Sequence, residues 1–266
     1  MKEGTEMNRY PDQMMARQAK FMGCLRTAGM PDSFYQRVID DKEFRDWLVG
    51  ESREKLGANV KETENQKAAR TIMGTNFLGL PEVVQHLGDL SEEQTATLAE
   101  VPFSEETLRA CAETHVLVAD IGLSTLDVRQ KARRDLFYSY DDAWYNGDKF
   151  ARETDEVCWR LIRKTPVDNS TSKTWGDQQK LIPETDEIPS ARQVVYMVIL
   201  HFLATGERLF EKSYVRTSFA SSRDSQVFVG SFDGGGLSFN YYSDDLRYDY
   251  LGVSSSRLLG SSDPRP

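Results

Sequence analysis

Three acidic residues in the last part of the chain, Asp244, Asp245 and Asp249, are candidate metal ligands because carboxylates lie close together there. Such a group suits Ca²⁺, which prefers about six to eight oxygen ligands. The EF-hand pattern D-x-D-x-D-G is absent, so the alternative is a solvated loop in an acidic protein. We favour the solvated loop and predict neither a metal ion nor another cofactor.

Nucleophilic catalysis has little support in the sequence. There is no C-x-x-C pair and no G-x-S-x-G motif, and the histidines lack ligand spacing. We predict that the cysteines are small buried residues in a reducing compartment. We also predict that His201, in the middle of an apolar segment, is a satisfied core histidine. The cysteines are Cys24, Cys111 and Cys158, and the histidines are His86, His115 and His201.

Two loops offer further candidates, and for each the structural interpretation is the stronger one. FDGGGLSF lacks the Gly-Lys-Ser/Thr ending of a phosphate-binding P-loop, so we predict a β-hairpin turn. DAWYNGDKF places Trp144 beside Tyr145, and these rings could stack on a ligand. We expect them instead to fill a gap between the helical and the β parts of the chain.

Residues 231–257 are built almost entirely from a narrow alphabet of Ser, Gly, Asp, Asn, Tyr, Phe, Leu and Arg. From residue 213 to 266 there is no Lys, Glu or His. Tyr gives a large stiff contact and Ser, Gly, Asn and Asp give adaptable hydrogen bonds, as in antibody binding loops. An outward face this rich in aromatic residues indicates a binding surface. Strand alternation makes the buried set Val227, Val229, Phe232, Leu237 and Phe239.

The elements that must position these residues begin with short helices. Residues 1–114 are polar and carry helix start signals such as Pro31-Asp32-Ser33. Gly79-Leu80-Pro81 opens a further helix that Gly88 ends, and Ser91 and Ser104 begin others. We therefore predict a helical N-terminal region over residues 1–114.

The character of the sequence changes at residue 115. HVLVADIG and VCWRLIRKTPV read as strands, and Ser124 caps a helix. Residues 190–206 form the strongest helix, which Ser190 caps, Gly206 ends, and apolar residues cover on nearly all faces. Four short strand candidates follow residue 212. The sequence therefore predicts an α+β chain, with a mixed domain of short antiparallel strands over residues 115–266.

Composition limits the partners and the compartment. The formal net charge is −9, which argues against nucleic-acid partners and against anionic membrane surfaces. No signal peptide or membrane span is visible in the 266 residues, so cytoplasmic residence is the default expectation, with signal-independent export possible. The expected partner is a protein or another macromolecule, and the oligomeric state stays open.

The later part of the sequence resembles a known family. YVRTS, VFVGSFDGGGLSF and DDLRYDYLGVSSSR together resemble the C-terminal region of variable proteins of diversity-generating retroelements, in the form found in candidate-phyla bacteria. The resemblance covers about residues 115–260. It implies a C-type-lectin-like fold that presents a variable ligand-binding surface. It also implies mutation at adenine in AAY-type codons, which seldom yields Lys, Glu or Gln.

The resemblance assigns roles within the variable segment, residues 218–257. The scaffold positions would be Val215, Arg216, Thr217, Val227, Val229, Gly230, Phe232, Asp233, Gly236, Leu237, Asp245, Leu251, Gly252 and Val253. The ligand-binding positions would be Phe219, Ser221, Ser222, Arg223, Phe228, Ser231, Ser238, Asn240, Tyr241, Tyr242, Ser243, Tyr248 and Tyr250. The calcium motifs of animal lectins and the paired cysteines of formylglycine-generating enzymes are both absent.

Three functions remain in view, and fold alone does not choose among them. The first is a non-enzymatic ligand-binding protein with a hypervariable surface. The second is a sulfatase-modifying type of enzyme-like domain, in which Asp233, Asp244 and Asp245 would converge in a pocket with perturbed pKa values. The third is a structural protein of a phage or mobile element. We favour the first.

Overall fold

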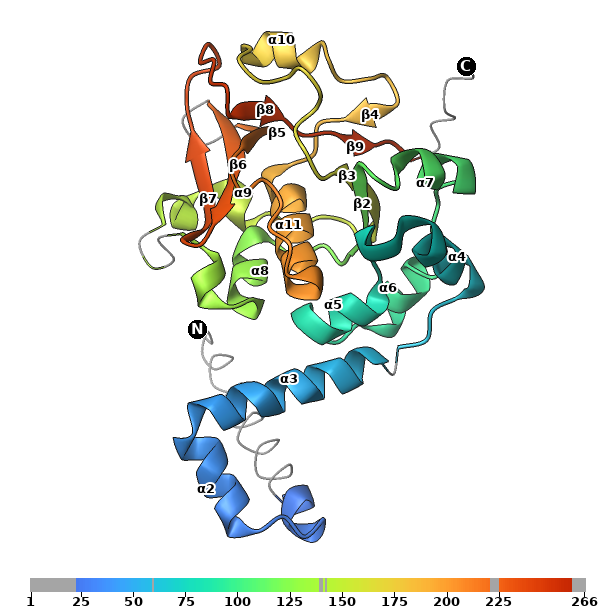
Figure 1. Cartoon of the computed structure of the whole chain (residues 1–266), viewed down its shortest axis with the longest axis vertical. Coiled ribbons are helices and arrows are strands. Elements are labelled where there is room, and N and C mark those ends of the chain that lie inside the picture. Colours follow the sequence, from blue (N-terminus) through green and yellow to red (C-terminus); the bar gives the residue numbers. More distant parts are fainter. Residues whose placement is uncertain (1–22, 59, 139–140, 142, 221–224, 260–266) are drawn as a thin grey trace, which may run out of the picture. The chain divides into compact units, whose positions relative to one another are not determined.

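The computed structural model describes residues 23–58, 60–138, 141, 143–220 and 225–259. The chain forms two compact units, Met1–Ser52 and Arg53–Pro266. Helices and strands are both present, with mixed strand pairing, which confirms the predicted α+β class (Figure 1).

The helices are short, apart from α3 and α11. They are α2 (Asp32–Asp40), α3 (Lys42–Ala58), α4 (Glu64–Met73), α5 (Leu80–Leu87), α6 (Glu92–Thr97), α7 (Glu105–Cys111), α8 (Thr125–Lys131), α9 (Lys149–Arg152), α10 (Trp175–Gln179) and α11 (Ala191–Thr205). Three 3₁₀ turns join them, η1 (Gly74–Asn76), η2 (Arg134–Leu136) and η3 (Trp144–Gly147).

In the first unit, aromatic side chains pack α2 against the first part of α3. The ring of Phe34 lies 5.7 Å from the ring of Phe44, which stacks on Trp47 at 5.5 Å between ring centroids. The predicted helix start at Pro31-Asp32-Ser33 is confirmed, with Pro31 as the N-cap.

The strands form two sheets. They are β1 (Phe77–Leu78), β2 (His115–Asp120), β3 (Cys158–Arg163), β4 (Asp186–Glu187), β5 (Tyr214–Ala220), β6 (Gln226–Asp233), β7 (Gly236–Tyr241), β8 (Leu251–Val253) and β9 (Ser256–Arg257). The first sheet has the order β1-β2-β3-β9-β4 and the second the order β7-β6-β5-β8. Most neighbours are antiparallel, but β1 pairs with β2 and β5 pairs with β8 in parallel.

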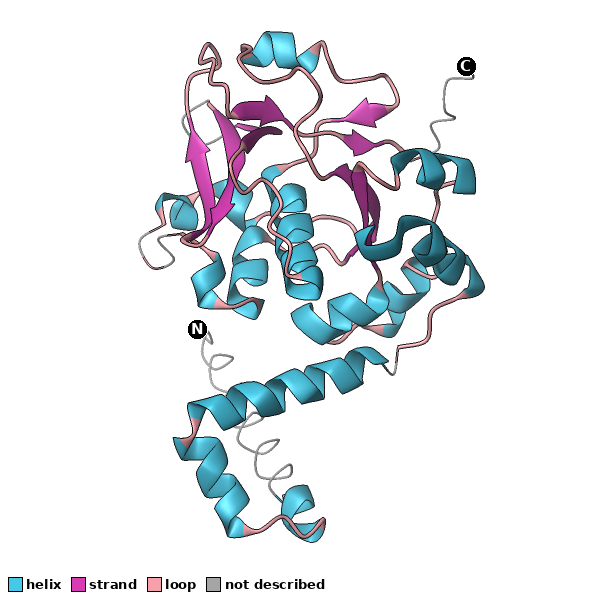
Figure 2. Ribbon diagram, viewed as in Figure 1, coloured by secondary structure: helices cyan, strands magenta, loops and turns pink. Residues whose placement is uncertain are grey.

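Helix α11 is the central element of the second unit, between the two sheets (Figure 2). Its residues from Ala191 to His201 are all buried, because apolar side chains surround the helix. The side chain of Ser190 accepts a hydrogen bond from the backbone N–H of Gln193, and Gly206 ends the helix at a φ of 78°. The predicted bounds and burial of this helix are therefore confirmed.

The local start signals are also confirmed. The hydroxyl groups of Ser91, Ser104 and Ser124 each accept a hydrogen bond from the backbone N–H three residues later. Each hydroxyl satisfies a donor that the first turn of a helix leaves unpaired. The FDGGGL hairpin is present as well, since Asp233 pairs with Gly236 between β6 and β7.

The predicted boundary between residues 114 and 115 does not separate two compact units. Helices α4 to α7 belong to the same unit as the strands, and one hydrophobic core runs from Ala69 to Phe239. The reason is β1, a two-residue strand within the helical segment, which pairs with β2 and so joins the helices to the first sheet. So short a strand leaves no periodic signal in the sequence.

Within the described residues, no helix is long and apolar enough to cross a membrane. The longest apolar run of the sequence lies in α11, where it is buried in the core.

His115, the first residue of β2, is buried and neutral in the folded chain. Its Nδ1 is hydrogen-bonded to the Thr114 hydroxyl at 2.8 Å, whereas its Nε2 is buried without a hydrogen-bond partner. Burial lowers the pKa of His115 from 6.5 to about 4; Asp186 opposes this shift, and Arg163 and Arg257 add to it. The imidazolium is therefore much less stable in the folded chain than in water.

We predict that His115 makes the fold less stable as the pH falls from 6.5 towards 4. In that range the unfolded chain binds a proton that the folded chain does not, and well above pH 6.5 neither state binds it. His115→Gln should reduce the slope of the unfolding free energy against pH by up to about 1.4 kcal/mol per pH unit. Urea unfolding at about pH 7 and about pH 5 measures the slope. Equal slopes for both proteins in this range would contradict the assignment.

Candidate ligand-binding face

The second sheet turns one face towards α11 and the other away from it. The inner face carries the five residues predicted to be buried, Val227, Val229, Phe232, Leu237 and Phe239, and all of them are buried. Residues that lie directly opposite each other in neighbouring strands share a face. The pairs Arg216–Phe228 and Phe228–Asn240 therefore form one row across the outer face, and Tyr214–Gly230 and Gly230–Ser238 form the next.

Five aromatic residues on this outer side form a closed set of contacts, which we call the five-ring cluster. Ring centroids lie 5.3 Å apart for Tyr214–Phe228, 5.5 Å for Phe228–Tyr242 and 6.4 Å for Tyr242–Tyr248. Tyr248 and Tyr250 stack at 5.0 Å, and Tyr250 closes the set on Tyr214 at 6.1 Å. Tyr242 and Tyr250 are 44% and 41% exposed as whole residues, so the cluster presents aromatic residues to solvent.

The loop from residue 242 to residue 250 carries three of these rings. From Asp244 to Tyr250, every second backbone carbonyl accepts a hydrogen bond from another segment of the chain. The carbonyl of Asp244 accepts from the backbone N–H of Trp175 at 2.9 Å, and that of Tyr248 accepts from Ser172 at 2.8 Å. The carbonyl of Tyr250 accepts from the N–H of Tyr214 at 2.8 Å. The carbonyl of Leu246, the fourth of the series, accepts from the guanidinium of Arg216 at 2.8 Å. The loop conformation is therefore set by main-chain groups.

Arg216 joins three segments under this loop. It is 1% exposed, and besides Leu246 its guanidinium donates to the side-chain oxygen of Gln178 at 2.8 Å and to the carbonyl of Lys173 at 3.2 Å. Burial lowers the pKa of Arg216, and Asp244 opposes that shift. The residue was expected at a scaffold position, and its contacts give a physical reason for that role.

The structure corrects the expectation that Phe228 is exposed. It lies on the outer face as predicted, but it is only 3% exposed because the rings of Tyr214 and Tyr242 pack against it. Tyr214 was missed as a member of this face. Its alternation with Arg216 in β5 was the available signal.

Tyr241 also departs from the prediction. Its ring lies 4.6 Å from Trp144, on the side of Phe239, and so it does not belong to the five-ring cluster. Trp144 donates to the carbonyl of Phe239, and the buried ring of Tyr145 lies 4.3 Å from the ring of Phe239. The expectation that Trp144 and Tyr145 fill a gap against the β part is therefore confirmed.

The remaining predicted positions are divided. Ser238 and Asn240 are half-buried on the outer face, and Ser243 is exposed. Ser231 is half-buried at a β-bulge with a φ of 48°. The predicted positions Ser221, Ser222 and Arg223 lie outside the described residues, as does the side chain of Phe219.

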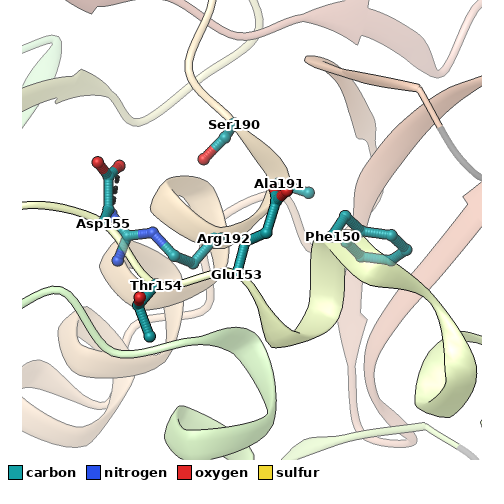
Figure 3. A pocket seen from close by; sticks show the side chains of 7 residues that line it. All are labelled: Phe150, Glu153, Thr154, Asp155, Ser190, Ala191 and Arg192. Carbon is teal, nitrogen blue, oxygen red and sulfur yellow. Dashed lines mark hydrogen bonds and ion pairs between the residues drawn. The ribbon is translucent and has the colours of Figure 1, made fainter.

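A separate polar pocket of about 180 Å³ lies at the start of α11 (Figure 3). It is lined by Phe150 and by residues 153–155 and 190–192. Arg192 donates to Asp120 at 3.0 Å and to Asp155 at 3.0 Å, and Arg160 donates to Asp120 at 2.8 Å. Burial opposes ionisation of Asp155, but Arg160, a backbone N–H and Arg192 together lower its pKa.

The charged groups at this pocket form ion pairs with one another. Two carboxylates meet two guanidinium groups, and within this set of four described side chains only the Nε atom of Arg192 is buried without a hydrogen-bond partner. The pocket therefore has the character of a structural ion-pair network.

The residues considered for catalysis or metal binding do not converge in the described part of the chain. Asp233, Asp244 and Asp245 do not line the pocket at the start of α11. They also do not line two other pockets, one formed by residues 84–89 and 130–131 and one formed by residues between 70 and 86 together with 204–205. No group of three or more His, Cys, Asp or Glu among the described residues is placed to hold a metal ion.

The cysteines differ in exposure. Cys111 is buried as predicted, Cys158 is half-buried, and Cys24 is exposed, contrary to prediction. Burial raises the pKa of the Cys158 thiol to about 11, so the thiolate that a nucleophile requires is disfavoured.

Comparison of the chain with protein-family models, with curated proteins and with solved structures finds no match.

We predict that Arg216→Met destabilises the second unit by about 2–4 kcal/mol, because the buried side-chain oxygen of Gln178 and the half-buried carbonyls of Lys173 and Leu246 lose their donor. The matched control is Tyr242→Asn, which changes an exposed ring of the same face and should cost less than about 1 kcal/mol. Urea unfolding measures both, and limited proteolysis should cleave the loop faster in Arg216→Met. Equal stability of the two variants would contradict the role assigned to Arg216.

Proposed function

We propose that this chain is a non-enzymatic ligand-binding protein that displays a hypervariable surface on a C-type-lectin-like scaffold, as the variable protein of a diversity-generating retroelement. The observation that carries the proposal is the loop held through its main chain. A surface that changes its side chains between relatives needs a backbone whose shape does not depend on those side chains. Four alternate carbonyls, from Asp244 to Tyr250, meet that requirement.

The distribution of burial supports the same proposal. All the expected scaffold positions are buried except Asp233 and Asp245. Of the expected variable positions whose side chains are described, only Phe228 is buried. Positions that must be fixed by packing and positions free to change are thus largely distinct.

Two glycines at expected scaffold positions have a steric reason to stay fixed. A Cβ atom on Gly230 would lie 2.2 Å from the carbonyl oxygen of Ser213, and its φ is 154°. A Cβ atom on Gly252 would lie 2.6 Å from both Pro166 and the hydroxyl of Ser170. Any side chain at these positions would displace the neighbouring segment.

The proposal predicts a feature of the flanking DNA that can be read directly. Near the gene there should be a near-copy of the codons for residues 218–257, which differs from the gene only where the copy has adenine. A reverse transcriptase gene should lie beside it. Sequencing of the genomic region makes the measurement, and the codons for residues 158–197 are the control, for which no copy is expected. If both the copy and the reverse transcriptase are absent, the diversified-surface proposal is wrong.

A further inference from the structure

The loop that carries three rings of the five-ring cluster has an excess of negative charge. Residues 242–250 contain Asp244, Asp245 and Asp249 but only one basic residue, Arg247. Asp245 and Asp249 are exposed, and neither forms an ion pair with any described residue. Asp244 is the exception, because it lies close enough to the buried Arg216 to influence its pKa.

Some carboxylates elsewhere in the second unit are neutralised within the fold. Asp120, Asp168 and Asp186 are held in ion pairs at 2.8–3.1 Å. Asp245 and Asp249 belong instead to the exposed carboxylates that form no ion pair, so their charges are available to a ligand.

The one basic residue of the loop lies within electrostatic reach of α10. Arg247 acts on Asp177 of α10, whose pKa is lowered by hydrogen bonds from Lys180 and Thr174 and, to a smaller extent, by the charge of Arg247. The charge of Asp249, by contrast, acts on Tyr250 of the five-ring cluster. Burial and the neighbouring tyrosines raise the pKa of Tyr250, and the charge of Asp249 adds to the shift. A carboxylate thus lies within electrostatic reach of an exposed ring.

We propose that the occupant of the five-ring cluster is a Lys- or Arg-bearing segment of a protein partner. The proposal rests on the ligand-binding function proposed above and names the chemistry of its ligand. The cations would lie against the exposed faces of Tyr242 and Tyr250, within reach of the carboxylate of Asp249, whose charge acts on Tyr250. Aromatic faces attract cations through the negative charge of their π systems. The net charge of −9 would also attract a basic segment from a distance.

The probe is a random-peptide display library panned on the purified full chain. Bound peptides should be enriched in Lys and Arg, and one such peptide is then labelled for fluorescence anisotropy. Tyr250→Ala should weaken its binding about two- to tenfold and Asp249→Asn about two- to fivefold. Because the charges are exposed, added salt should weaken the wild-type complex.

The matched control is Asp89→Asn, which removes the same charge at an exposed carboxylate between α5 and α6 and should leave the dissociation constant unchanged. Unfolding curves check that each variant is folded. If binding of the selected peptides depends on Tyr250 but the peptides are not enriched in Lys or Arg, the proposed cationic ligand is wrong. The proposed ligand-binding function of this face then stands. If no selected peptide depends on Tyr242 or Tyr250, the ligand-binding function of this face fails as well.

Discussion

The ion-pair network between the end of β2 and the first turn of α11 determines how the second unit is assembled. Asp120 is fully buried, and it meets Arg160 of β3 and Arg192 of α11. Desolvation of the charges costs several kcal/mol per ion, so the network adds little net stability. Its effect is on position, because a shift of the helix start would separate Arg192 from the buried Asp120 and leave that carboxylate only Arg160. Removal of one partner from a buried ion pair costs about 3–5 kcal/mol.

Because the ion pairs fix the start of α11, this helix determines which face of each sheet is buried and which is exposed. The helix is apolar on every side, and it packs against β1 and β2 of the first sheet and against β5 and β6 of the second. The inner face of the second sheet is therefore committed to the core. Its outer face is free to carry the five-ring cluster, and Arg216 and the segment around α10 hold the adjoining loop. The five-ring cluster and the core thus lie on opposite sides of a single sheet.

The sequence predicted the features that depend on neighbouring residues. The serine caps, the bounds of α11 and the FDGGGL hairpin follow from local chemistry. The features it missed depend on distant partners. The parallel pairing of β5 with β8 and the contact of Arg216 with Leu246 join residues far apart in the chain. Alternation correctly placed Phe228 on the outer face but could not show that Tyr214 and Tyr242 cover it. Of the candidate site, the outer face was therefore predictable, whereas the cluster and its support were not.

The succession of β8 and β9 has a consequence for synthesis on the ribosome. Leu251–Val253 pairs with β5 in one sheet, and Ser256–Arg257 pairs with β3 and β4 in the other. Both sheets therefore receive their final strand from a stretch of only seven residues, 251–257. Until that stretch has left the exit tunnel, the nascent chain has made α11 but lacks a strand in each sheet. Such non-local pairing forms slowly. The two sheets are thus completed together, once residues 251–257 have emerged, and the emerging chain carries exposed apolar surface until then.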